Sequence, residues 1–441
     1  MTAVDRDQLR IHRTDGASRP PARSVILFIG DGMGQAHRLG GQLLTGGRTG
    51  RLAMDRLPVV GQMGTMPDDP ARFVTDSAAA ATALATGVKT SNGAIAIAPD
   101  GTRLPTILEL AKRAGKSTGL VTTCQITDAT PAAFAAHVPH RSDQSEVARQ
   151  YLEETGVDLI LGGGAAYWYP AGAATPFPAD STDPLQASRG TAGDLVARAR
   201  ALGYAFVTSA ADLRAATALP SRLPSGSADC RVVLPTRLLG LFANQELFAQ
   251  RPEGQGDAYA PPVTLADLTE AAITLLSRNP EGFFLMVEES AIDRMAHRNN
   301  APLTLKGVLE LDRAVRVALA HAEADPETLI VVTADHECGG LAIAGSDDPP
   351  YPYEPGGGLL ETVMAGEDGP FPIAGADHGF VMGWATTGHT AASVPLTAAG
   401  PGAEALAGFY ENTHPFGVMA EALGLAVPAG RRWSANGSSA T

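Results

Sequence analysis

Short, uncharged apolar runs separated by helical segments dominate the pattern of this chain. The clearest are SVILFIG at residues 24–30, GFFLMV at 282–287 and TLIVVT at 328–333. Runs of this length are typical of parallel strands buried on both faces of a sheet, and they are shorter than the roughly 18 residues that cross a bilayer. We therefore expect a mostly parallel central sheet and no membrane span.

Helices are predicted between these strands. Residues 104–114, 264–278 and 416–423 have the pattern of helices, while 117–123, 157–161 and 381–385 predict additional strands. Regular alternation of strand and helix predicts an α/β fold of three layers, a mostly parallel central sheet with helices on both faces.

One helical segment begins with a candidate nucleophile. In FVTDSAAAATALATGVK, at residues 73–89, Thr75, Asp76 and Ser77 are helix-opening residues, the alanines favour helix, and Gly87 is a natural stop. Backbone N–H groups and the helix dipole favour an anion at such an N-terminus. A serine here is often only a cap, so a catalytic role for Ser77 depends on what other segments bring to it.

The chain is expected to form one large domain, because α/β enzymes of 441 residues often do so with insertions. Residues 346–379 are rich in Pro, Gly and acidic side chains, which indicates a small insertion outside the sheet. We assign Asp377 and His378 within it to a loop and not to a site. Polar tails at 1–23 and 431–441 flank the main domain at 24–430.

Composition narrows the classes of partner. Lys plus Arg number 33 against 47 Asp plus Glu, a net charge of -14, so the overall field repels nucleic acid and anionic membranes. An anionic substrate would need local positive charge, which metal ions supply.

Residues 1–23 lack the apolar core of an intact signal peptide, which leaves a cytoplasmic protein or one whose leader was removed. Cys124, Cys230 and Cys338 allow at most one disulfide and are not spaced as a zinc site.

Acidic and histidine side chains stand where predicted strands end: Asp31, Glu288, Asp335, His336 and His389. Asp293 and His297 are four residues apart, so they point the same way on a helical turn. These residues also have ordinary explanations. Asp31 could be a turn residue, Asp293 and His297 a pair on a solvated helix face, and His389 a structural histidine. Because the carboxyl ends of parallel strands meet at one edge, together they predict a site. Such nitrogen and oxygen ligands suit Zn²⁺ and Mg²⁺.

The segment after the strand at 117–123 has two interpretations. Asp128 and Thr130 are suited to cap a short helix with Pro131 at its first position, and Arg141 alone is most simply a surface charge. The same residues also lie at the edge of the sheet where the site is expected.

These blocks resemble the alkaline phosphatases, metal-dependent phosphomonoesterases with a serine nucleophile. The matching blocks are FIGDGMG (28–34), VTDSAAAATALATG (74–87), ITDATPAAFAAHV (126–138), VEESAID (287–293), TADHE (333–337) and TTGHT (386–390). They occur in the order of the family, which makes the combination far more specific than any single motif. The resemblance implies an alkaline phosphatase-like fold and hydrolysis of phosphate monoesters.

It further implies two Zn²⁺ and one Mg²⁺ per subunit. The implied ligands are Asp293, His297 and His389 for the first zinc, Asp31, Asp335 and His336 for the second, and Thr130 and Glu288 with Asp31 as a bridge for the magnesium. Ser77 would form a phosphoserine intermediate and Arg141 would hold two phosphate oxygens. These roles agree with phosphoryl transfer, which needs in-line positioning and charge stabilisation.

The chain departs from many family members beside the third metal. Many have His where this chain has Asp128, and His or an aromatic residue where it has Arg294, whereas others pair Asp with Lys. The resemblance to the second group predicts that Asp128 reaches the third metal through water and that Arg294 partly neutralises it. Because Arg is not equivalent to Lys, phosphate affinity and pH optimum depend on this pair.

Related activities define the alternatives. A sulfatase needs a C/S-x-P-x-R context, whereas Ala78 and Ala79 follow Ser77. A phosphodiesterase of the same superfamily usually has a threonine nucleophile and lacks the equivalent of Arg141, which makes it the second choice. A phosphate-binding protein without turnover would not need Ser77. The family is usually exported and dimeric, so a periplasmic or secreted homodimer is expected, with inorganic phosphate and small phosphate monoesters as its ligands.

Overall fold

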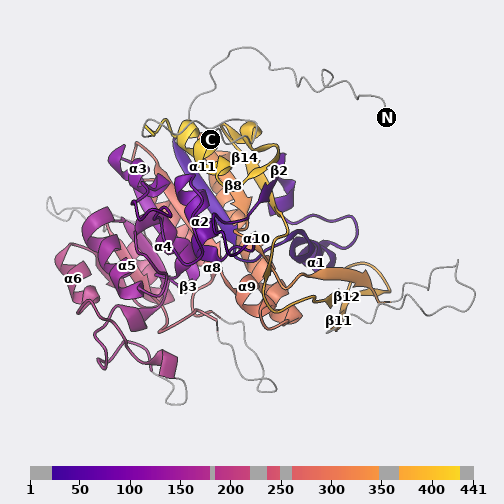
Figure 1. Ribbon diagram of the computed structural model, residues 1–441, viewed down its shortest axis with the longest axis horizontal. Coiled ribbons are helices and arrows are strands. Elements are labelled where there is room, and N and C mark those ends of the chain that lie inside the picture. Colours follow the sequence, from indigo (N-terminus) through magenta and orange to yellow (C-terminus); the bar gives the residue numbers. More distant parts are fainter. Residues whose placement is uncertain (1–21, 179–183, 219–235, 249–260, 347–366, 428–441) are drawn as a thin grey trace, which may run out of the picture.

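A ten-stranded sheet forms the centre of the computed structural model, which describes residues 22–178, 184–218, 236–248, 261–346 and 367–427 (Figure 1). The strand order is β15-β2-β14-β8-β1-β7-β3-β4-β6-β5. The bounds are β1 Ser24–Gly30, β2 Val59–Gly64, β3 Ser117–Gln125, β4 Leu159–Gly163, β5 Ala205–Val207, β6 Leu238–Leu241, β7 Phe283–Glu289, β8 Thr328–Thr333, β14 Val394–Ala399 and β15 Gly408–Glu411.

The predicted apolar runs form the middle of this sheet. β1 pairs in parallel with β7 on one side and β8 on the other, and all residues of these three strands are buried. Burial on both faces is what continuous apolar strands require. Only β14 pairs antiparallel to its neighbours, β2 and β8. The expectation of a mostly parallel sheet is confirmed.

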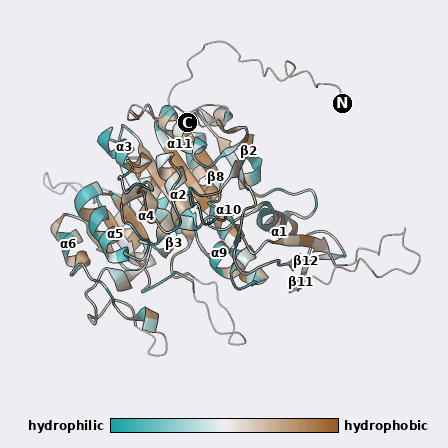
Figure 2. Ribbon diagram, viewed as in Figure 1, coloured by the Kyte–Doolittle hydropathy of each residue, from teal (hydrophilic) through white to brown (hydrophobic). Residues whose placement is uncertain are grey.

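Helices cover both faces of the sheet. α2 (Ser77–Thr86), α3 (Ile107–Arg113), α4 (Ala129–Ala135) and α11 (His414–Ala422) pack together on one face, and α8 (Leu265–Leu276), α10 (Ala301–Ala324) and α1 (Gln35–Gly46) on the other. Apolar residues concentrate on the strands and polar ones on the outer helix surfaces (Figure 2). In the described part of the chain, no helix combines the length and apolarity of a membrane span. The three-layer prediction is confirmed.

Shorter elements complete the layers. The helices are α5 Gln144–Gln150, α6 Leu195–Ala201, α7 Ala210–Thr217 and α9 Ala291–Ala296. Single turns lie at η2 Met54–Arg56, η3 Tyr151–Thr155, η4 Ala165–Tyr167, η5 Pro184–Gln186 and η6 Ala403–Leu406. β9 (Glu337–Cys338) pairs antiparallel with β13 (His389–Thr390), and this two-residue ladder lies beside the site.

A separate small sheet corrects one strand prediction. The strand expected at 381–385 is β12 (Gly379–Gly383), and it pairs antiparallel with β10 (Ala342–Gly345) and β11 (Glu367–Pro372), not with the central sheet. β10 follows β8 closely in the sequence and β11 lies in the segment expected to be an insertion, and local periodicity does not show that these strands pair with β12. Asp377 and His378 are exposed between β11 and β12. Residues 347–366, within the expected insertion, and most of both predicted tails lie outside the described residues.

Two helix starts also differ from expectation. α3 begins at Ile107 and not at 104, because Thr106 caps it: the Thr106 hydroxyl accepts a hydrogen bond from the Glu109 N–H, and the Glu109 carboxylate accepts one from the Thr106 N–H. α4 begins at Ala129, so Pro131 is its third residue and not its first. Asp128 stands at the N-cap position without a capping hydrogen bond, which leaves its carboxylate available for other partners.

Candidate active site

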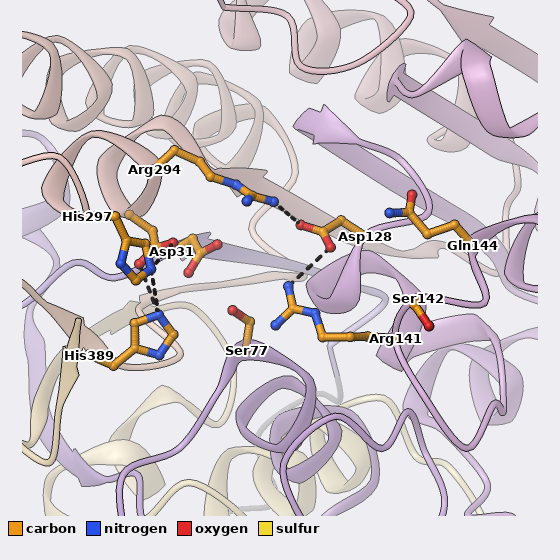
Figure 3. A pocket seen from close by; sticks show the side chains of 10 residues that line it. Asp31, Ser77, Asp128, Arg141, Ser142, Gln144, Arg294, His297 and His389 are labelled. Atoms are coloured by element: carbon orange, nitrogen blue, oxygen red, sulfur yellow. Dashed lines mark hydrogen bonds and ion pairs between the residues drawn. The ribbon is translucent and has the colours of Figure 1, made fainter. Parts of the chain in front are cut away.

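A polar cavity of about 460 Å³ opens at the carboxyl ends of the central strands (Figure 3). Asp31 follows β1, Asp128 follows β3, and Asp293 and His297 come from the helix after β7. In the close-up view, Ser77 lies between the histidines and the Asp128–Arg141 pair. The residues that line the cavity are Asp31, Ser77, Asp128, Arg141, Ser142, Gln144, Asp293, Arg294, His297 and His389.

Ser77 is the first residue of α2. The Asp76 side chain caps this helix by accepting a hydrogen bond from the Ala79 N–H at 3.0 Å, and Gly87 ends it with a positive φ of 69°. Ser77 is 3% exposed, and its Oγ lies 3.1 Å from His336 Nε2. The serine therefore meets both the positive end of a helix dipole and the buried acidic edge of the sheet.

Asp31, Asp335 and His336 form one buried group behind Ser77. His336 Nε2 lies 3.4 Å from Asp31 Oδ1 and 3.2 Å from Asp335 Oδ2. Both carboxylates thus face the same ring nitrogen that Ser77 contacts. In a serine–histidine–aspartate triad the carboxylate instead binds the opposite ring nitrogen, so this arrangement does not match a triad.

The donor atoms of this group fit a cation. Asp31 Oδ1 and Asp335 Oδ2 are buried without a hydrogen-bond partner in the described structure, and donor atoms of the three residues lie within 4.8 Å of one another. Burial and the charges of Asp335 and Asp293 raise the pKa of Asp31 well above its ordinary value, and burial raises the pKa of Asp335 to about 6. Carboxylates crowded in this way are stabilised by positive charge.

Asp293, His297 and His389 form a second group on the other side of the cavity. The Nε2 atoms of His297 and His389 are 3.0 Å apart, and they lie 3.3 and 3.4 Å from the Asp293 carboxylate. Each Nδ1 faces a carbonyl oxygen, of Thr387 at 2.6 Å and of Thr75 at 2.9 Å. Because a carbonyl only accepts, Nδ1 carries a proton in both rings and the Nε2 atoms point into the group, where they face the carboxylate when protonated and would face a metal ion when neutral.

Electrostatics around Asp293 agree with that orientation. Burial opposes ionisation, but the hydrogen bonds to His297 and His389 hold the pKa of Asp293 well below its ordinary value. The pKa values of His297 and His389 are raised by their contacts with this carboxylate, against the effect of burial. A negative carboxylate between two inward-facing imidazoles is a donor set suited to Zn²⁺.

A third set of oxygens surrounds Glu288. Glu288 is 1% exposed and its Oε2 accepts a hydrogen bond of 2.5 Å from the Thr122 hydroxyl. Burial raises the pKa of Glu288 to about 8, in spite of that hydrogen bond and with a contribution from the charge of Asp128. The buried Thr130 hydroxyl has no hydrogen-bond partner among the described residues. Oxygen ligands of this kind suit Mg²⁺.

Asp128 links two guanidinium groups at the cavity wall. Its Oδ1 accepts a hydrogen bond from Arg141 at 3.1 Å and its Oδ2 accepts one from Arg294 at 2.7 Å (Figure 3). A second carboxylate, Asp76 Oδ2, lies 3.3 Å from Arg141. Although burial opposes it, the two arginines hold the pKa of Asp128 well below its ordinary value. Arg141 is therefore a fixed cation in the cavity wall and not a surface charge.

Several residues of the site were not among the predicted site residues, including Ser142 and Gln144 in the cavity wall. Asp76 orients Arg141 in addition to capping α2, and Cys124 Sγ lies 3.5 Å from Asp128 Oδ2. Cys338 lies within the Asp293 group. In the sequence, the position of Cys338 two residues after His336 could have indicated that it belongs to the site, but the chain lacks the cysteine spacing that marks zinc sites.

Comparisons with known proteins agree with this geometry. A family model described as alkaline phosphatase matches residues 22–351. The chain is 36% identical to streptomycin-6-phosphate phosphatase of Streptomyces griseus, over 93% of each protein, and 33% identical to alkaline phosphatase of Escherichia coli (strain K12), over 93% of this chain and 88% of that one. A variant of TAB5 alkaline phosphatase with Mg bound in its M3 site superposes with a TM-score of 0.67 at 27% identity, covering 92% of this chain and 99% of that one. The chain therefore belongs to the alkaline phosphatase family, whose members are metal-dependent phosphomonoester hydrolases.

Proposed function

We propose that this enzyme hydrolyses small phosphate monoesters through a phosphoserine intermediate on Ser77. The observation that carries the proposal is the position of Ser77 Oγ, at the N-terminus of α2, 3.1 Å from His336 Nε2 and in the same cavity as Arg141. A phosphoryl group bonded there would meet helix N–H groups on one side and a guanidinium on another.

Three cations are proposed in the groups described above. Asp293, His297 and His389 would hold one Zn²⁺, Asp31, Asp335 and His336 a second, and Thr130 and Glu288 with Asp31 an Mg²⁺. Asp128 would reach the Mg²⁺ through water, with Arg294 reducing its negative charge. When bound, such cations neutralise charge on phosphoryl oxygens and lower the pKa of an attacking hydroxyl or water.

Ser77 and Arg141 carry the two chemical steps. As Ser77 Oγ bonds to phosphorus, its hydroxyl proton leaves to solvent, the bond from phosphorus to the alcohol oxygen breaks, and that oxygen takes up a proton from solvent as the alcohol departs. Arg141, held by Asp76 and Asp128, binds two phosphoryl oxygens and keeps the group in line. Water then attacks the phosphoserine, inorganic phosphate departs, and Ser77 regains a proton.

Assembly and location are further parts of the proposal. We infer a homodimer that is periplasmic or secreted, as is common in this family, acting on phosphate monoesters and releasing inorganic phosphate. The net charge of -14 disfavours nucleic acid as a partner. Fractionation of cells that express the full chain tests the location.

The decisive experiment compares p-nitrophenyl phosphate with its bis-ester at alkaline pH, before chelation, after chelation and after Zn²⁺ and Mg²⁺ are returned. We expect a monoester rate that vanishes and recovers, and ³²P bound to Ser77 after an acid quench. Ser77→Ala should lose the covalent label and at least about 10³-fold in kcat, since an activated nucleophile is removed. Dominant turnover of the bis-ester would move the assignment to a phosphodiesterase, and metal binding without turnover would reject both.

A further inference from the structure

Cys338 places a sulfur atom beside the Asp293 group. Its Sγ and the donor atoms of Asp293, His297 and His389 all lie within 4.8 Å of one another. Tetrahedral ligands about 2.0–2.3 Å from a zinc ion lie roughly 3.3–3.8 Å apart, so side-chain movements of about 1 Å suffice to bring donor atoms at the 4.8 Å limit onto one ion. The four donor atoms are therefore close enough to surround one ion.

Backbone contacts hold Cys338 in this position. Its N–H donates a hydrogen bond of 3.0 Å to the Gly32 carbonyl, and it pairs in register with His389 between β9 and β13. Gly32 has a positive φ of 72°, and a Cβ there would lie 2.9 Å from both Asp293 Cβ and Cys338 Cβ. Glycine at this point lets the carboxylate and the thiol approach each other.

The thiol approaches the group from its buried side. Asp293, His297 and His389 line the cavity, whereas Cys338 does not line it and is fully buried. Asp293 Oδ1 is also buried and makes no hydrogen bond of good geometry among the described residues, although His389 Nε2 lies 3.4 Å from it. Within the described part of the chain, the thiol makes one hydrogen bond, a long one of 3.8 Å to the Asp293 carbonyl. A sulfur ligand here would be the fourth protein ligand and would lie on the buried side, so that phosphate in the cavity would bind as a fifth ligand.

We propose that Cys338 is an additional ligand of the ion held by Asp293, His297 and His389. The inference rests on the proposed function, which places a metal in this group. On binding, a sulfur–metal bond forms and the thiol proton passes to solvent. Because thiolate is a soft ligand, Cys338 makes this position prefer Zn²⁺, Co²⁺ or Cd²⁺ over Mg²⁺.

Spectroscopy of the full-length enzyme tests the proposal. In the variant C124S/C230S, Cys338 is the only thiol; Cys230 lies outside the described residues. The variant is freed of metal by chelation and titrated with Co²⁺, while the bound metal is quantified. We expect a sulfur-to-cobalt charge-transfer band in the near ultraviolet, and a Zn–S shell near 2.3 Å in X-ray absorption of the zinc-loaded protein.

C338S is the matched control. It should lose the charge-transfer band and bind Cd²⁺ at least on the order of tenfold more weakly, with a smaller change for Mg²⁺. The bands of C124S/C230S are informative even if C338S does not fold.

The outcomes separate this inference from the proposed function. If C124S/C230S binds Co²⁺ and hydrolyses p-nitrophenyl phosphate without a sulfur band, Cys338 is only a buried core residue beside Trp384 and Phe380, and the inference fails alone. If C124S/C230S and the wild-type chain bind no metal and hydrolyse nothing, the proposed function fails as well.

Discussion

At the scale of the residue, Arg294 sets the charge available at the proposed magnesium position. Its guanidinium binds Asp128 at 2.7 Å, and its charge offsets a small part of the rise that burial causes in the pKa of Asp31. Arg294 is mostly buried, with 33% of its side chain exposed, so solvent screens this charge only in part. A fixed cation at this point opposes the binding of another cation by the neighbouring carboxylates.

Replacing Arg294 should therefore strengthen Mg²⁺ binding. Arg294→Ala removes one positive charge near Asp128, and we expect the Mg²⁺ affinity to rise roughly tenfold, which corresponds to about 1.4 kcal/mol. Mg²⁺ titration of the zinc-loaded enzyme by calorimetry gives the affinity directly. Release of phosphate should become faster, because Arg294 no longer neutralises Asp128 and the uncompensated carboxylate repels the bound anion.

Arg294→Lys is the matched control. It keeps the charge but cannot reproduce the planar hydrogen bond to Asp128, so its Mg²⁺ affinity should stay within about threefold of that of the wild type while phosphate affinity changes. An Arg294→Ala enzyme with unchanged metal affinity and unchanged phosphate release would show that Arg294 has no part in the site.

At the scale of the element, a largely buried pair of side chains, His137 and Glu109, fixes the position of α4. Asp128 and Thr130 stand at its N-terminal end, and His137 follows its C-terminal end. His137 Nε2 lies 3.1 Å from Glu109 of α3, and His137 Nδ1 donates to the Ala96 carbonyl at 3.0 Å. These contacts fix the direction in which α4 presents the proposed ligands.

The His137–Glu109 pair predicts a pH-dependent contribution to stability. Burial lowers the pKa of His137 and nearby Arg103 adds to this, but the hydrogen bond with Glu109 outweighs both and leaves it above 6.5. Burial similarly opposes ionisation of Glu109, yet its hydrogen bonds with His137 and Thr106 leave its pKa below 4.5. The stabilisation by His137 is complete below its unfolded pKa, near 6.5, and is lost as pH rises through its folded pKa; that by Glu109 is lost as pH falls through its lowered pKa.

His137→Gln should therefore be most harmful in mildly acidic solution. For metal-loaded protein, we expect the variant to melt about 2 °C below the wild type at pH 6, with a smaller difference at pH 9. Differential scanning calorimetry at both pH values measures this, and Glu109→Gln provides the complementary control. Equal differences at both pH values would mean that the pair contributes as neutral groups only.

Elements with strong local patterns were predictable from the sequence, and those set by distant pairing were not. β1 and β8 have the predicted bounds because their apolar runs end abruptly in glycine or a polar residue. β12 was misjudged as a strand of the central sheet because a short apolar run does not specify its pairing partners, which here are β10 and β11. The proximity of Cys338 to His389 likewise depends on a two-residue ladder that no periodicity predicts.

At the scale of the whole molecule, the sheet ends in an edge strand with an apolar surface. β15 pairs only with β2 among the described strands, and Phe409 stands opposite Gln62 in that pairing. Side chains alternate along a strand, so Val60 and Phe409 lie on the same face. Val60 is 63% exposed and Phe409 68% exposed, which is unusual for apolar residues on an unprotected edge.

The proposed homodimer would cover this edge with a second copy. A two-fold axis beside β15 brings Phe409 and Val60 of both subunits together, since an isologous interface joins the same surface of each copy. Phe409→Glu combined with Val60→Glu would bury like charges across that axis, so we expect at least about a hundredfold weaker dimerisation, seen by light scattering over a range of concentrations. Gln62→Glu on the same face is the charge control and should weaken the dimer less, because it removes no apolar contact. A wild-type chain that stays monomeric at every concentration would reject the homodimer, whereas a double variant that remains dimeric would place the interface on another surface.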